Sequence, residues 1–183
     1  ETSDDEDASE KRKASSPSKV LEKVKAYITE NQLSADDGDS LWCVIDVDRW
    51  PQEQIEELHA FCAQKDNWHL VISNPSIEIW LLYHKRADLS DLGIQTAKDA
   101  KQALDRIEKG GYYYIKYLPL MLDAIENAQQ ADSNPDGYMP ELLQTKVYQL
   151  GRALYDRMGK VRFEKFVASL PGIEKEILKQ KKR

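Results

Sequence analysis

Two carboxylates with a single residue between them follow an apolar run in the first third of the chain. The run covers residues 41–45, and the carboxylates are Asp46 and Asp48. Residues i and i+2 of a strand point to the same side, so both carboxylates would project together from a strand end. Two like charges that are this close repel each other unless a cation or a proton lies between them. The pattern favours a Mg²⁺ site, because this ion takes carboxylates, water and substrate phosphate as ligands.

A second group of polar side chains follows the next apolar run. Ser73 and Asn74 come directly after residues 68–72, and Glu78 lies near the start of an apolar helical segment. Buried glutamates are rare unless they are paired or metal-bound, which favours Glu78 as a further ligand. The alternative is structural: Glu78 would interact with the helix dipole, and Ser73 and Asn74 would cap the helix. Asp48 has the same alternative as a cap of the helix that follows it.

A strand–helix–strand unit is expected to position these groups. Residues 41–46 and 68–72 are nearly all apolar, which is typical of strands covered on both faces of a parallel sheet, and Pro51 begins a helix between them. Strands joined by a helix within about thirty residues run parallel, so their C-terminal ends lie at one edge of the sheet. Open α/β sheets bind their ligands at that edge. The sequence therefore predicts an α/β fold with the polar residues gathered there.

Helices are expected in most of the remaining chain. Their predicted starts are at Pro17, Pro51, Pro75, Thr96 and Thr145. In the last of these helices, Leu154 and Met158 are expected on the inward face. The four tyrosines in residues 112–117 could stack on bases, but their place beside a long helical segment favours packing between helices.

The composition is that of one ordinary domain with charged ends. The 183 residues are 41% hydrophobic, enough to bury a core, and the net charge of -6 argues against a strongly basic nucleic-acid binder. No signal peptide opens the chain and no apolar run approaches the ~20 residues that span a bilayer, so we expect a cytoplasmic protein. We expect a flexible tail over residues 1–15, a domain over 16–170 and a basic tail over 171–183.

The thiol and imidazole side chains do not have the spacing of a metal site. Cys43 lies in an apolar run and Cys62 in a helical pattern, and we expect two reduced, buried thiols. His59, His69 and His84 are spread over different expected elements with no His-x-x-x-His spacing, which argues against zinc.

Four blocks of the sequence together resemble RloB-like proteins. They are WCVIDVD at 42–48, SNPSIEIWLLYH at 73–84, YIKYLP at 114–119 and TKVYQL at 145–150. The resemblance covers roughly residues 17–158, and the Ser-Asn-Pro-x-x-Glu-x-Trp-Leu-Leu block is its most specific part. RloB-like proteins have a Toprim-type fold, belong to restriction-modification and abortive-infection loci beside a partner ATPase, and are similar to the Toprim nuclease module of OLD-family proteins.

The resemblance implies roles for particular residues. Asp46 and Asp48 match the Asp-x-Asp metal ligands of Toprim domains, and Glu78 matches the glutamate after the second strand, a further metal or catalytic carboxylate. Lys146 falls in the late basic motif and would contact phosphate. Ser73 and Asn74 lie at the second strand end, where they could orient a ligand, so the candidate substrate-binding residues are Ser73, Asn74 and Lys146. The implied cofactor is Mg²⁺ or Mn²⁺.

One departure from the Toprim pattern concerns the start of the fold. Toprim domains begin with a strand that ends in a glutamate, whereas no strand-like run precedes Pro17 here. We therefore expect the first Toprim strand to be missing from the chain as given. The remaining fold is expected to be a Toprim-like, mostly parallel sheet that is flanked by helices and has a helical C-terminal part.

The expected function is Mg²⁺-dependent hydrolysis of DNA or RNA phosphodiesters in antiphage defence. The implied partners are nucleic acid, the ATPase of the same locus and, as a homodimer, a second copy of the chain. The alternative is a non-catalytic subunit that docks on the ATPase or senses nucleic acid. HAD-like phosphatases also carry Asp-x-Asp after a strand, but they need Thr or Val two residues later, where this chain has Trp50.

Overall fold

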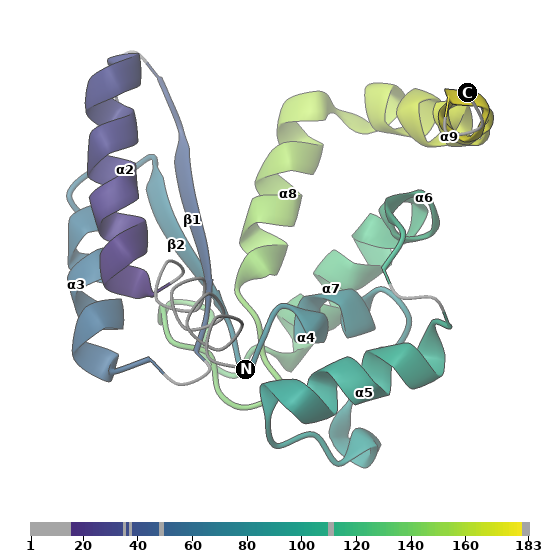
Figure 1. Cartoon of the computed structure of the whole chain (residues 1–183), viewed down its shortest axis with the longest axis horizontal. Helices are drawn as coiled ribbons and strands as arrows, with labels where there is room; N and C mark the ends of the chain where they lie inside the picture. The colour runs from purple at the N-terminus through teal and green to yellow at the C-terminus, as the bar shows by residue number, and fades with distance from the viewer. Residues whose placement is uncertain (1–15, 35, 37, 48–49, 110–111, 181–183) are drawn as a thin grey trace, which may run out of the picture.

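The chain folds into a mixed α/β structure with two parallel strands and many helices (Figure 1). The computed structural model describes residues 16–34, 36, 38–47, 50–109 and 112–180, with side chains as far as Glu174. The strands are β1 (Leu41–Asp46) and β2 (Trp68–Ser73). The α-helices are α2 (Pro17–Asn31), α3 (Gln52–Cys62), α4 (Glu78–Tyr83), α5 (Ala97–Ile107), α6 (Tyr114–Tyr117), α7 (Met121–Ala131), α8 (Val147–Met158) and α9 (Lys160–Gln180), and the 3₁₀ turns are η1 (Ser90–Leu92) and η2 (Leu118–Leu120). The tail expected over residues 1–15 lies outside the described residues.

The strand–helix–strand unit forms as predicted. β1 pairs with β2 in parallel, from Leu41 opposite Trp68 to Asp46 opposite Ser73. Ser16 caps α2 by accepting a hydrogen bond from the amide of Lys19, and a proline follows in the first turn. α2 and α3 lie along the same face of the strands (Figure 1). The apolar core between them contains Leu21, Cys43, Ile45, Ile55, Leu58, Cys62, Leu70 and Ile72.

Among the described residues, the opposite face of the sheet is covered at β2 and exposed at Val44 of β1. α8 packs against β2, where Val71 is fully buried. Val44 of β1, which is the register partner of Val71, is 43% exposed. Both strands were expected to be buried on both faces of the sheet. This prediction is confirmed for β2 and wrong for β1, where Val44 is exposed. The apolar run predicts a strand, but the helix that covers it comes from a distant part of the chain.

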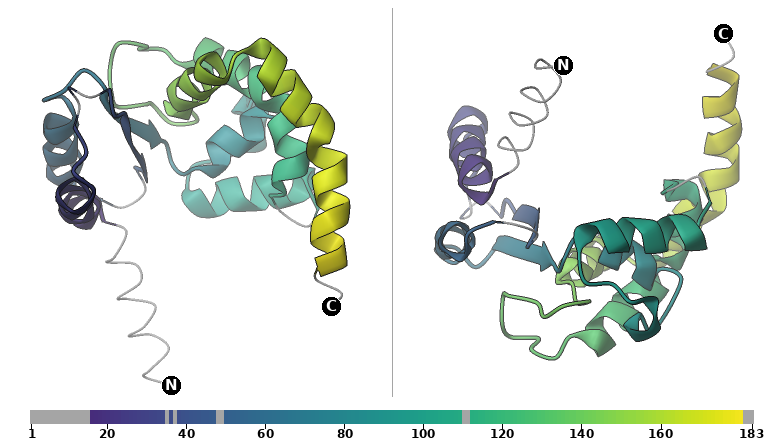
Figure 2. Two further views of the ribbon diagram at one scale, coloured as in Figure 1. Left: turned by 90° about the horizontal axis from the view of Figure 1, so that it is seen from above. Right: turned by 60° about the horizontal axis from the view of Figure 1, so that its bottom comes forward.

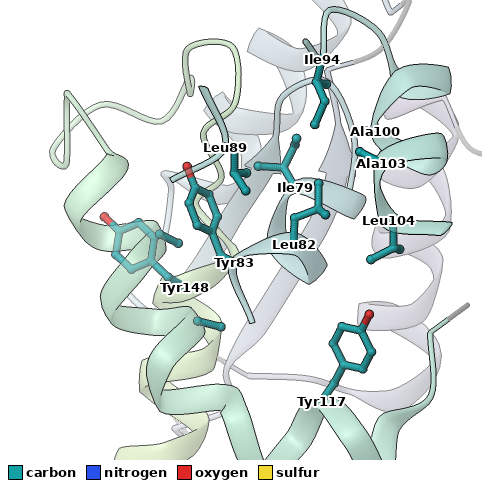
Figure 3. Packing of buried hydrophobic residues seen from close by; sticks show 12 residues of the cluster. Ile79, Leu82, Tyr83, Leu89, Ile94, Ala100, Ala103, Leu104, Tyr117 and Tyr148 are labelled. Carbon is teal, nitrogen blue, oxygen red and sulfur yellow. The ribbon is translucent and has the colours of Figure 1, made fainter. Parts of the chain in front are cut away.

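The second part of the molecule is a helical layer built around α4. α4 packs against α5 and α7, and Ile79, Leu82 and Tyr83 are buried in the resulting core (Figure 3). The helix begins at Glu78, three residues later than predicted, after a cis peptide bond between Asn74 and Pro75. This apolar helix is buried, as its composition predicts.

α8 departs from its predicted orientation. Leu154 and Met158, expected on its inward face, are 53% and 38% exposed. The buried residues of α8 are Val147, Tyr148 and Gly151, all in its first half, and the helix packs against β2, α7 and α9. α9 follows and continues past residue 170, where the domain was expected to end. It lies on the far side of the helical layer from the sheet (Figure 2).

In the described part of the chain, none of the helices combines the length and the apolar character needed to cross a bilayer.

Candidate functional site at the strand ends

The C-terminal ends of the two strands meet at one edge of the sheet. Asp46 is the last residue of β1 and lies in register with Ser73, the last residue of β2. The amide of Val47 donates a hydrogen bond of 2.9 Å to the carbonyl oxygen of Ser73, which extends the pairing beyond the strands. The side chain of Asp46 is half-buried. Asp48 lies outside the described residues.

A third segment, residues 143–146, runs antiparallel beside the end of β2. The amide of Lys146 donates to the carbonyl oxygen of Ile72 at 2.7 Å, and the amide of Asn74 donates to that of Gln144 at 2.9 Å. The amide of Leu143 closes the pairing on the carbonyl oxygen of Asn74 at 3.0 Å. The loop before α8 is thereby joined to the strand end that carries the candidate residues.

Ser73 is held inside this edge by a residue that sequence reasoning missed. Its hydroxyl oxygen lies 2.7 Å from that of Thr145, and both side chains are fully buried. Thr145 Oγ1 also accepts a hydrogen bond from the amide of Val147. Ser73 therefore supports the edge from within. Its predicted contact with substrate is not available in this arrangement, since no part of its side chain reaches solvent.

Asn74 and Glu78 lie on the connection from β2 into α4. The Asn74 side-chain amide donates to the carbonyl oxygen of Pro140 at 3.0 Å, which ties the connection to the loop before residue 143. Glu78 is the first residue of α4 and is half-buried. A carboxylate in this position interacts favourably with the free amides of the first turn. The buried hydroxyl of Ser76, two residues earlier, has no hydrogen-bond partner within the described residues.

Lys146 is placed differently from the prediction. Its side chain is 1% exposed, and the ammonium donates to both carboxylate oxygens of Asp132, at 2.8 and 2.6 Å, and to the carbonyl oxygen of Asn134. The predicted contact with phosphate does not fit this geometry, because all three donors of the ammonium face internal acceptors. Asp132 lies fourteen positions earlier, and the sequence contains no spacing signal that links the two residues.

Tyr148 completes this buried cluster. Its hydroxyl donates to Asp132 at 2.8 Å. Burial, together with the hydrogen bond to the Asp132 carboxylate, raises the pKa of Tyr148 to about 12. The carboxylate of Asp132 thus accepts hydrogen bonds from Lys146, from Tyr148 and from the amide of Asn134, which is the pairing that a buried charge requires. The cluster fixes the segment that holds Thr145 against Ser73.

The donors at this edge match Mg²⁺ in kind. Asp46 and Glu78 offer the carboxylate oxygens that this ion prefers. Within the described residues, however, no three His, Cys, Asp or Glu side chains lie close enough together to hold a metal ion. The predicted set also contains Asp48, which is not described, so a site made of Asp46, Asp48 and Glu78 stays a prediction.

The three histidines occupy separate places. His59 stacks on Tyr138 and His69 stacks on Trp42, with ring centroids 3.8 and 4.0 Å apart. His84 is buried, and its Nδ1 lies 2.9 Å from the carbonyl oxygen of Trp80. Burial lowers the pKa of His84 to about 4. Each imidazole thus contributes to local packing.

Comparison with known proteins adds one finding. No curated protein and no solved structure matches the chain. A family model described as RloB-like protein matches residues 2–154, which is most of the sequence. The motif blocks of the sequence lie along β1, at the end of β2, in α4 and at the start of α8. Because the family model matches well over half of the chain, the chain belongs to the RloB-like family.

Proposed function

We propose that this chain is a Toprim-like nuclease module that hydrolyses DNA or RNA phosphodiesters with Mg²⁺ or Mn²⁺. The observation that supports the proposal is the position of Asp46, at the carboxyl end of a parallel strand and in register with Ser73. This is the edge at which α/β sheets bind ligands. Membership of the RloB-like family supports the same function.

In this proposal each candidate residue has a distinct task. Asp46, Asp48 and Glu78 hold the metal ion through their carboxylates. When bound, the ion supplies charge stabilisation at the phosphate and lowers the pKa of its water. Ser73 positions the edge through Thr145, and Asn74 shapes the connection to Glu78 through its bond to Pro140. The biological setting that we propose is antiphage defence, with the ATPase of the same locus as partner.

The test is cleavage of DNA and tRNA by the full-length protein, with and without the partner ATPase, in Mg²⁺ and in Mn²⁺. Asp46→Asn, Asp48→Asn and Glu78→Gln remove charge and keep volume. We expect each to lower the cleavage rate by about 100-fold or more, because a lost metal ligand weakens both the ion's affinity and its orientation. Asp105→Asn, at an exposed position on α5, is the matched control and should cleave at the wild-type rate. Cleavage that survives all three site substitutions contradicts the proposal.

A second candidate function is that of a non-catalytic subunit that binds the ATPase or senses nucleic acid. Calorimetric titration with Mg²⁺ and a pull-down with the partner ATPase separate the two functions. Binding of the partner without cleavage and without metal binding favours the non-catalytic subunit.

A further inference from the structure

An open cavity lies between the C-terminal end of α4 and one face of α7, two helices that pack against each other. Residues 84–87, which follow α4, form one wall. Leu120, Asp123, Glu126 and Asn127, on α7 and the turn before it, form the other wall. The volume of the cavity is about 420 Å³, which is within the range of small-molecule sites.

The buried part of the first wall is the imidazole of His84, which is 7% exposed. Its Nδ1 lies 2.9 Å from the carbonyl oxygen of Trp80. Because a carbonyl oxygen can only accept, Nδ1 carries the hydrogen and donates it, which leaves a lone pair on Nε2. Burial lowers the pKa of His84 to about 4, so the ring is neutral near pH 7. Within the described residues Nε2 has no hydrogen-bond partner, and a buried acceptor of this wall is therefore unused.

The wall on α7 supplies further acceptors. Asp123 and Glu126 are exposed and lie three positions apart, so their carboxylates share one face of the helix. Neither carboxylate has a hydrogen bond or an ion pair in the part of the chain that the structure describes. Nδ2 of Asn127 donates to the carbonyl oxygen of Tyr83 at 2.9 Å, which leaves the Asn127 side-chain oxygen as an acceptor. Both walls thus offer acceptors that lack a donor.

Two cationic side chains also line the cavity, but both are paired with acids outside it. The ammonium of Lys85 lies 3.2 Å from a carboxylate oxygen of Glu108, which Lys116 also contacts. Arg86 donates to both carboxylate oxygens of Asp91, at 2.9 Å each. Bidentate pairing of this kind fixes the guanidinium in place. The unpaired charges at the cavity are therefore the two carboxylates on α7.

We propose that this cavity binds a primary alkylammonium group, such as one end of a small aliphatic diamine. An ammonium combines a positive charge with three N–H donors, which suits the Nε2 lone pair of His84 and the carboxylates of Asp123 and Glu126. Ala87 and Leu120 offer apolar contact to the attached methylene chain. A metal ion is a poorer match, because no three His, Cys, Asp or Glu side chains among the described residues lie close enough together to hold one.

The experiment is calorimetric titration of the full chain with putrescine near neutral pH in metal-free buffer. We expect saturable binding at a single site with a Kd below about 1 mM. The control ligand is putrescine with both nitrogens fully methylated, which keeps the positive charges and loses every N–H donor. It should show no saturable binding. Absence of putrescine binding would overturn the proposal, and so would equal binding of the methylated ligand or of Mg²⁺, because either would show general attraction of cations to an acidic chain.

Substitutions locate the binding in this cavity. Asp123→Asn and Glu126→Gln keep the size of the side chain and remove its charge, and each should weaken putrescine binding by about tenfold. Glu57→Gln, at an exposed position on α3, is the matched control and should bind like the wild type. His84→Phe keeps a ring without Nε2 and should abolish binding. Unchanged affinity in both α7 variants would refute the proposal even if His84→Phe does not fold, since both α7 positions are exposed.

The same ammonium group ends the side chain of lysine, so a protein could also supply it. Titration with Nα-acetyl-lysinamide distinguishes the two sources: tighter binding than putrescine assigns the cavity to a lysine of another protein, and weaker binding assigns it to a free diamine. Binding at this cavity does not depend on the proposed nuclease activity, because Asp46, Asp48 and Glu78 are not among the lining residues. Loss of putrescine binding therefore leaves the nuclease proposal standing, and an inactive protein can still bind putrescine.

Discussion

Replacing Lys146 by methionine should destabilise the protein strongly. The substitution keeps the length of the side chain and removes the ammonium that donates to both oxygens of Asp132. The Asp132 carboxylate, whose side chain is fully buried, would then retain two neutral donors, the hydroxyl of Tyr148 and the amide of Asn134, and no cation. A charge left in the interior without its counter-ion costs far more than the pair itself contributes.

The expected loss follows from that burial. Removing one partner of a buried ion pair costs about 3–5 kcal/mol of unfolding free energy. For a chain of this length, each kcal/mol lowers the melting temperature by about 2–4 °C, so a fall of roughly 10 °C is expected. Lys116→Met is the matched control, since Lys116 pairs with Glu108 but is 53% exposed. Exposed pairs contribute about 0–1 kcal/mol, and this variant should remain close to the wild type.

Urea unfolding followed by circular dichroism measures both variants, and a cycle with Asp132→Asn isolates the pairwise energy. The double variant should lose less than the sum of the two single variants, because the second substitution removes the charge that the first one left unpaired. A Lys146→Met protein within about 0.5 kcal/mol of the wild type would refute the buried pair. It would return Lys146 to the phosphate-binding role that its sequence motif implies.

Two further predictions concern pH and the strand edge. Burial lowers the pKa of His84 from its ordinary value of 6.5 to about 4. Between pH 6.5 and pH 4, His84 is therefore protonated in the unfolded chain and neutral in the native state. The free energy of unfolding should therefore fall by about 3 kcal/mol as the pH drops from 7 to 4. The urea midpoint of His84→Gln should fall less over the same pH range, and an equal fall in both proteins would contradict the lowered pKa of His84. Ser73→Ala and Thr145→Val should each cost about 1–3 kcal/mol, because each leaves a buried hydroxyl without its partner. The double variant should be more stable than the sum of the single losses predicts, and strict additivity in urea unfolding would argue against the contact.

The sequence by itself determined the elements whose signals are local. The apolar runs predict β1 and β2, Ser16 with Pro17 marks the start of α2, and Thr96 begins α5 through a capping box with Asp99. The short strand–helix–strand spacing determined that the strands run parallel. That arrangement alone places the end of β1 beside the end of β2, which is why the register of Asp46 and Ser73 could be anticipated.

Only the tertiary structure decided which partners the polar and apolar side chains meet. Periodicity defines a stripe on α8 but not the length over which another element covers it, so Leu154 and Met158 are exposed. Lys146 has the residue type of a phosphate ligand, yet Asp132 reaches it across a loop and holds it inside. Local propensity depends on neighbours within a few residues, whereas burial and pairing depend on chain segments that become neighbours only when the whole chain has packed.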